Sequence, residues 1–203
     1  MLTCAIRPAG IYGEKDTTFT HKILEHSAKA SPFVLSLQLG DNNNLFDFTY
    51  VGNIAYAHLL AAYRLSATKD RYDAGQTAPL DHERIDGEAF NITNETPVYF
   101  WDMTRAAWAL TDKYVEPNQV WELPEAILGP IGGLAETVLG LFGKTPRLTK
   151  RMVRYSCMTR YYSANKARMR LGYRPVVPVD EGLARAVGFV LAKDQEASGK
   201  KVL

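Results

Sequence analysis

The sequence predicts an α/β fold, and three observations lead to this prediction. Leu2–Ile6 is a short apolar run ended by Arg7 and Pro8, which is typical of a buried strand in a parallel sheet. Downstream, short runs rich in aromatic and β-branched residues alternate with longer runs of helical periodicity. The 203 residues are 46% hydrophobic and 23% charged, which is ordinary for a globular protein and argues against a disordered chain.

The first strand is followed by a predicted helix and a second strand. Thr17 or Thr18 can cap a helix that continues to about Ala30. Pro32 ends this helix, because the residue before a proline is pushed out of helical geometry. Phe33–Leu39 alternates apolar and polar residues, which predicts a strand.

A second strand–helix pair is predicted next. Phe46–Val51 is rich in aromatic and β-branched residues and is expected to be a strand. Asn53 is a suitable N-cap for a helix over Ile54–Ser66. Residues 67–87 are polar and contain glycine and proline, so they are expected to form a long surface loop.

The rest of the chain is predicted to be mainly helical. Glu88–Thr93 is expected to be a strand, and Val98–Tyr114 an amphipathic helix. Ser163–Gly172 has a capping residue at its start and a glycine at its end, which predicts a short helix. Val179–Gln195 is expected to be the last helix.

One apolar segment precedes a strongly basic one. Leu123–Phe142 has the minimum length for a membrane span, but its two glutamates, two prolines and four glycines argue against a spanning helix. From Lys144 to Arg174 the chain carries ten lysines and arginines and no acidic residue. An apolar helix beside a basic surface is typical of a protein that lies on an anionic membrane face. The alternative is an apolar lid over a substrate cleft beside a solvated basic run.

The residue types that metal sites and hydrolytic enzymes require do not occur in a recognisable pattern. Cys4 and Cys157 are too few for a disulfide framework and indicate a reducing compartment, and no metal-ligand spacing is present. No serine or cysteine nucleophile has a motif that would activate it. His58 lies among apolar residues of a predicted helix and is expected to be a packing or capping residue.

Four stretches, in this order, resemble the 3β-hydroxysteroid dehydrogenase family of extended short-chain dehydrogenase/reductases. The branch most similar is that of the decarboxylating sterol-4α-carboxylate 3-dehydrogenases, because of the pairing of Ile92–Asn94 with Phe100–Asp102 and the apolar segment after residue 120. Each stretch alone is a weak signal, whereas the ordered set spans most of the chain. The stretches are Met1–Gly13, Phe48–His58, Gly87–Asp102 and Lys166–Pro175.

The resemblance implies the C-terminal part of an NAD(P)-binding Rossmann-like fold with a mostly helical substrate-binding subdomain. Residues 1–66 would be a remnant of the Rossmann sheet and the start of the substrate region. Residues 67–197 would form the substrate-binding subdomain, with the apolar segment 123–142, and residues 198–203 a tail.

The resemblance also implies an activity, the oxidation of a 3β-hydroxyl of a sterol or steroid to a 3-ketone with NAD or NADP. The family binds the cofactor with a glycine-rich turn and transfers protons with a Tyr-x-x-x-Lys pair. Gly129–Gly133 is not preceded by a strand, and Tyr162 and Lys166 fall after the position that the family's pair occupies. We therefore assign no catalytic residue and expect the isolated chain to be inactive.

The resemblance places the cofactor's nicotinamide against the loop after the first strand, which gives Pro8, Ala9, Gly10 and Ile11 as cofactor-binding residues. Proline fixes φ, and Gly10 permits a close backbone approach. Taken without the resemblance, the same residues are an ordinary turn after a strand.

Further expectations concern partners and location. The resemblance implies a sterol substrate, peripheral association with the endoplasmic reticulum membrane or a lipid surface on its cytoplasmic face, and a homodimer. No RNA-binding motif surrounds the tyrosines of the basic run, so no nucleic-acid partner is expected. Two alternatives stay open, another extended dehydrogenase such as a sugar-nucleotide epimerase or ketone reductase, and a non-catalytic module that binds lipid surfaces.

Overall fold

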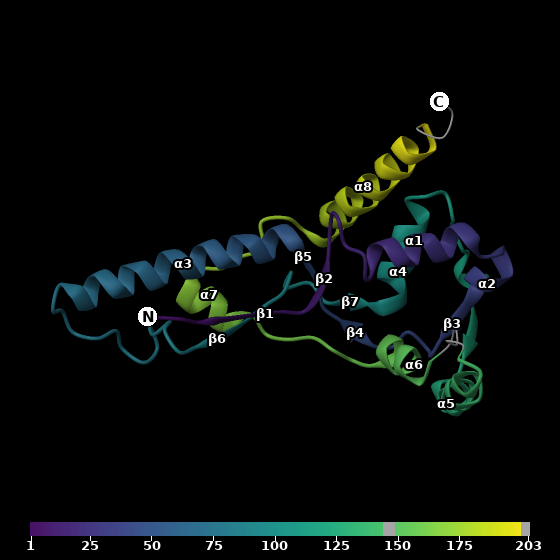
Figure 1. The fold of residues 1–203 in the computed structure, drawn as a ribbon, viewed down its shortest axis with the longest axis horizontal. Helices are drawn as coiled ribbons and strands as arrows, with labels where there is room; N and C mark the ends of the chain where they lie inside the picture. Colours follow the sequence, from purple (N-terminus) through teal and green to yellow (C-terminus); the bar gives the residue numbers. More distant parts are fainter. Residues whose placement is uncertain (144–148, 200–203) are drawn as a thin grey trace. The chain divides into compact units, whose positions relative to one another are not determined.

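The computed structural model describes residues 1–143 and 149–199 (Figure 1). The predicted basic run from Lys144 and the predicted tail at 198–203 therefore lie partly outside the described residues. The chain forms two compact units, each built from segments that are far apart in the sequence. The first unit comprises residues 1–20, 47–97 and the chain from 161 onward, and the second comprises residues 21–46 and 98–160.

The strands of the first unit pair in parallel, as the sequence predicts. β1 (Ala5–Pro8) pairs with β6 (Ala89–Ile92), and β2 (Gly10–Tyr12) pairs with β5 (Phe48–Tyr50). The side chains of β1 are exposed or half-buried, so the prediction of a buried strand at this position is wrong for these residues. Within the described chain β6 is the one strand that pairs with β1.

Three helices belong to the first unit, namely α3 (Val51–Asp73), α7 (Asn165–Leu171) and α8 (Val179–Gly199). α3 begins two residues before Asn53 and continues well into the segment predicted to be a loop. The N-cap prediction for Asn53 is therefore wrong. The glycine that ends α7 is confirmed, because Gly172 adopts a φ of 75° that only glycine tolerates readily.

The core of the first unit lies where α3 and α7 cover β6. Phe90 and Ile92 project from β6 into this core and are fully buried, as is Tyr173 just after α7. Each such side chain contributes about 2 kcal/mol by leaving water. The members of the cluster are Ile54, Ala57, Ala61, Ile85, Phe90, Ile92, Ala167, Leu171 and Tyr173.

The second unit contains the remaining strands and helices. β3 (Leu37–Leu39) pairs in parallel with β8 (Trp121–Leu123), and β4 (Leu45–Phe46) pairs antiparallel with β7 (Val98–Tyr99). Trp108 is buried against Leu35 and Val115 and donates its indole N–H to the carbonyl of Ile23 at 3.0 Å. The helices are α1 (Thr20–Lys29), α2 (Pro32–Ser36), α4 (Phe100–Ala109), the 3₁₀ turn η1 (Pro117–Gln119), α5 (Glu125–Leu141) and α6 (Lys150–Cys157).

Two predictions for residues 17–39 are wrong in an informative way. Asp16, and not a threonine, caps the start of α1, because its carboxylate accepts the N–H groups of Thr18, Phe19 and Thr20. The predicted strand Phe33–Leu39 is helical over its first four residues, which belong to α2, and only Leu37–Leu39 forms a strand. Pro32 follows the end of α1 as predicted, and it also occupies the first turn of α2, where the lack of an N–H costs no helix hydrogen bond and the Ser31 hydroxyl serves as the cap.

The predicted strand Phe46–Val51 and helix Val98–Tyr114 are each divided. Asp47 interrupts the first, so that residues on its two sides pair with different strands. The second begins with the two residues of β7 and ends at Ala109, five residues earlier than predicted.

α5 contains most of the apolar segment and packs closely on α6. A Cβ added to Gly132 would lie 2.9 Å from the backbone nitrogen of Lys150, so the glycine permits this approach. Among the described residues, no helix has the length and apolar character needed to cross a membrane.

Candidate functional site

The four residues that the resemblance assigns to the cofactor form the Pro8–Ile11 loop, which joins the last residue of β1, through Ala9, to the first two residues of β2. It lies at the carboxyl ends of β1 and β6, the edge at which parallel sheets usually bind ligands. Ala9 is buried and donates its N–H to the Ile92 carbonyl at 3.1 Å. Gly10 donates its N–H to the Asp47 carbonyl at 3.0 Å, so two neighbouring strands fix the loop.

These bonds decide which groups of the loop can meet a ligand. The N–H groups of Ala9 and Gly10 are used within the chain, and Pro8 has none. The side chain of Ile11, at the start of β2, is 47% exposed and can meet a ligand.

Asp47, whose backbone carbonyl accepts the N–H of Gly10, has a buried carboxylate. Asp47 is 1% exposed, and its Oδ2 accepts the N–H of Tyr162 at 2.7 Å. Its Oδ1 is buried and has no hydrogen-bond partner among the described residues. Burial raises the pKa of the Asp47 carboxyl, and the bond from Tyr162 offsets this only in part.

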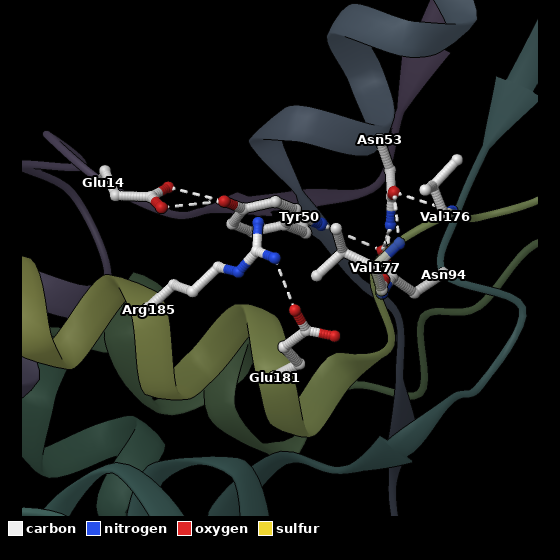
Figure 2. A network of polar contacts seen from close by, with 8 residues as sticks. All are labelled: Glu14, Tyr50, Asn53, Asn94, Val176, Val177, Glu181 and Arg185. Atoms are coloured by element: carbon white, nitrogen blue, oxygen red, sulfur yellow. Dashed lines mark hydrogen bonds and ion pairs between the residues drawn. The ribbon is translucent and has the colours of Figure 1, made fainter.

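Two asparagines join the strands to the segment before α8 (Figure 2). The Asn53 amide donates to the Asn94 Oδ1 at 3.0 Å and to the Val177 carbonyl at 2.7 Å. Its carbonyl oxygen accepts the N–H groups of Val176 and Val177 at 2.9 and 3.0 Å. Asn94 also accepts the N–H of Tyr50 and donates to Val177, so both side chains are buried with their polar atoms paired.

A second set of polar contacts lies around Tyr50 (Figure 2). The Tyr50 hydroxyl donates to the carboxylate of Glu14, at 2.8 and 2.9 Å from its two oxygens. Arg185 of α8 lies beside Tyr50 and pairs with Glu181 one turn earlier on the same helix. Burial raises the pKa of Tyr50, and the bond to Glu14 raises it further.

Tyr12 and Tyr173 are two further buried tyrosines, and both bond within the chain. Burial raises the pKa of Tyr12, whose hydroxyl donates to the Val179 carbonyl at 3.1 Å. Burial likewise raises the pKa of Tyr173, whose hydroxyl donates to the Thr93 carbonyl at 2.9 Å. A tyrosine whose pKa is raised keeps its proton at neutral pH and is a poor general base.

The motifs that look catalytic in the sequence have other surroundings in the structure. Tyr162 precedes α7, whereas Lys166 lies within it and pairs with Glu88, so one helix face does not present both. Gly129–Gly133 lies inside α5, in place of a turn between a strand and a helix. The Nδ1 of His58 lies 2.8 Å from the carbonyl of Ile54 on the same helix.

The described residues contain no cluster of histidine, cysteine or carboxylate side chains that could hold a metal ion. Sequence reasoning missed the buried roles of Asp47 and Asn94 and assigned Asn53 to a helix cap. Each lies within or beside an apolar run, but the run does not show which of its polar residues is buried. Such a residue, once buried, needs hydrogen-bond partners.

Comparison with curated proteins agrees with the resemblance. The sterol-4-alpha-carboxylate 3-dehydrogenase, decarboxylating, of Saccharomyces cerevisiae is 40% identical over 189 residues, which are 93% of this chain and 49% of that protein. The human protein of that name is 30% identical over 92% of this chain and 46% of its own length. An Arabidopsis thaliana 3beta-hydroxysteroid-dehydrogenase/decarboxylase, isoform 2, is 36% identical over 92% of this chain and 31% of its own. The chain thus spans about half the length, or less, of the curated relatives it matches.

Solved structures show the same fold. An epimerase of Methanothermobacter thermautotrophicus matches with a TM-score of 0.59 at 17% identity, over 98% of this chain and 46% of that one. The UDP-glucose 4-epimerase of Thermotoga maritima matches with a TM-score of 0.54 at 18% identity, over 95% of this chain and 47% of that one. These likenesses establish the Rossmann-like α/β fold that the resemblance implies.

The parallel strand pairs and the loop at their carboxyl ends agree with these likenesses. A sequence model of the 3-beta hydroxysteroid dehydrogenase/isomerase family matches residues 1–125, which include that loop and the Asn53–Asn94 contact. The chain therefore belongs to the 3-beta hydroxysteroid dehydrogenase/isomerase family.

Proposed function

We propose that the chain supplies the nicotinamide-side loop and the substrate region of an NAD(P)-dependent sterol 3β-dehydrogenase. The observation that supports this most directly is the match of about nine-tenths of the chain to sterol-4-alpha-carboxylate 3-dehydrogenases of several organisms. The position of Pro8, which pairs with Ile92 at the carboxyl ends of β1 and β6, agrees with it.

In the proposed reaction the 3β-hydroxyl of a sterol gives its proton to a general base of the whole enzyme and C3 gives up a hydride, which produces a 3-ketone. The nicotinamide supplies the hydride acceptor when it is bound. For a 4α-carboxysterol the product is a β-keto acid, which loses carbon dioxide. In this reaction the role of the Pro8–Ile11 loop is to orient the nicotinamide carboxamide with its backbone carbonyls, and Gly10 allows the cofactor to approach closely.

A chimeric enzyme tests this proposal. The matching 189-residue region of the Saccharomyces cerevisiae relative would be replaced by that of this chain, and oxidation of a 4α-carboxysterol would be measured with NAD and with NADP. We expect cofactor-dependent ketone formation with release of carbon dioxide. We expect Gly10→Val to raise the KM for the cofactor, since its side chain would fill the approach to the loop.

Two results would contradict the proposal. A folded chimera that does not oxidise the sterol is one, and a chimera that instead epimerises a UDP-sugar is the other, which would support the epimerase alternative. The 203 residues alone are expected to show no turnover, because we assign no catalytic residue within them.

We also propose that the chain binds a membrane surface through α5 and α6, as expected for a protein of the endoplasmic reticulum or of lipid surfaces. Apolar side chains recur on α5 at helical spacing and are exposed, from 44% at Val138 to 81% at Leu141. Lys150, Arg151 and Arg154 lie on the adjacent α6. The other exposed apolar residues of α5 are Ile127, Ile131 and Leu134.

Flotation with vesicles tests the membrane proposal. We expect the chain to float with vesicles that contain phosphatidylserine, and Leu134→Glu with Val138→Glu to abolish this. A matched control is Leu59→Glu with Leu80→Glu, two exposed leucines of the first unit. Equal flotation of the α5 variant and the wild type would refute the proposal.

The choice between NAD and NADP stays open, and the homodimer stays a prediction.

A further inference from the structure

A cavity of about 780 Å³ lies in the first unit between α3, α7 and the segment that leads into β6. Its lining is rich in cationic side chains and includes a single carboxylate. The charged or titratable residues that line it are Arg64, Arg71, His82, Glu83, Lys166 and Arg170. The volume is that of a typical small-molecule site.

Helical spacing aims the cations into this cavity. Arg64 and Arg71 are seven residues apart on α3, so they share one face, with about 10 Å between their Cα atoms. Lys166 and Arg170 are four residues apart on α7 and share the face that lines the cavity. α3 reaches Arg71 because it continues into residues that the sequence predicts to be a loop.

Existing ion pairs neutralise only part of this charge. Glu88 contacts Lys166 and Arg170, the two α7 cations that line the cavity, and the Nη1 of Arg170 lies 3.3 Å from its carboxylate. Arg64 and Arg71 form no ion pair with any carboxylate in the described part of the chain. The Nε of Arg71 is buried and lacks a hydrogen-bond partner there, which is a costly state for a charged donor.

We propose that this cavity binds a small molecule that carries two or more phosphate groups. The planar fork of arginine matches phosphate oxygens in pairs, and Arg64 and Arg71 supply two such groups to the lining of the cavity. The cavity lies beside Glu88, at the amino end of β6, whereas Pro8 pairs with Ile92 at the carboxyl end of β6. The site is therefore additional to the loop assigned to the nicotinamide, and the inference does not depend on the proposed function.

Calorimetric titration of the 203-residue chain with inorganic pyrophosphate tests the site. We expect saturable binding that weakens about tenfold or more in the double variant Arg64→Gln/Arg71→Gln, because each substitution removes a charge-assisted hydrogen bond. The control Arg174→Gln/Lys193→Gln removes the same charge at exposed positions outside the lining and is expected to bind as the wild type does. Arg64→Lys/Arg71→Lys, which keeps the charge, is expected to retain part of the affinity and to melt at the wild-type temperature.

A second titration separates a soluble phosphate compound from a phospholipid headgroup. Vesicles of phosphatidylcholine with and without a phosphatidylinositol bisphosphate would be offered to the wild type and to Arg64→Gln/Arg71→Gln. Binding to this lipid that needs the two arginines, without pyrophosphate binding, identifies a headgroup site, and the reverse identifies a soluble ligand. The proposal is overturned if neither probe depends on Arg64 and Arg71, or if the control variant loses as much affinity as the test variant.

Discussion

At the scale of single residues, Asn53 has the densest set of buried contacts near the site. Its amide is fully buried and bonds with Asn94, Val176 and Val177 through all of its polar atoms. An amide is suited to this position because it both donates and accepts. Removing it would leave several buried backbone groups without partners.

We therefore expect Asn53→Ala to lower the free energy of unfolding by about 3 kcal/mol, the sum of several unsatisfied buried groups. Urea denaturation followed by circular dichroism measures this. Asn118→Ala, at an exposed asparagine, is the matched control and is expected to change stability by less than about 0.5 kcal/mol. A similar small loss in both variants would contradict the role assigned to Asn53.

Asp47 leads to a prediction about pH. Burial raises the pKa of its carboxyl in the folded chain, so folding favours the protonated form. This contribution to stability is complete below the carboxyl's pKa in the unfolded chain, about 3.9, and is lost as the pH rises through the folded value. Asp47→Asn removes the titrating group, so the variant should gain stability relative to the wild type as the pH rises.

The measurement is urea denaturation of both proteins between about pH 4 and pH 7. Asp81→Asn, which removes an exposed carboxylate of the same unit, serves as the control. A difference between wild type and Asp47→Asn that does not vary with pH would show that the carboxyl is not destabilised by burial.

At the scale of elements, the placement of α8 depends on a glycine that packs on two tyrosines. A Cβ added at Gly182 would lie 2.7 Å from the Tyr12 hydroxyl and 3.0 Å from the Tyr50 ring. The first distance is shorter than real Cβ contacts, and the second is tighter than most of them. The helix therefore approaches β2 and β5 closely only because this position has no side chain.

We expect Gly182→Ala to destabilise the chain by about 1–3 kcal/mol through overpacking, despite the better helix propensity of alanine. Gly188→Ala in the same helix is the control, since a Cβ there meets nothing within 4 Å. It should stabilise the chain by about 0.5–1 kcal/mol. Thermal melts of the two variants should thus shift in opposite directions, and a shift in the same direction would contradict the close packing.

At the scale of the whole molecule, the two units differ in their buried cores. Among the described residues, most of the buried apolar side chains belong to the first unit, including Tyr12, Phe48, Phe90 and Tyr173. The three tryptophans, at positions 101, 108 and 121, all belong to the second unit. Tryptophan fluorescence therefore reports on the second unit alone.

We expect the fluorescence transition in urea to have a lower midpoint than the transition followed by circular dichroism, because less apolar surface stabilises the second unit. Coincident midpoints would instead indicate that the chain unfolds in one cooperative step. Trp108→Phe, which retains most of the packing, should reduce the fluorescence amplitude and leave the dichroism midpoint nearly unchanged.

The sequence by itself determined the features that depend on neighbouring residues. The parallel strand class, β6, the glycine that ends α7 and the start of α8 follow from apolar periodicity and capping, which act within a few positions. It also determined the family, because its motifs keep their order along the chain. Only the tertiary structure decided the role of Asn53, which bonds with Val177, 124 positions away, and the length of α3. Burial and hydrogen bonding bring distant segments together, so no local sequence pattern predicts which polar residue of an apolar run will be buried.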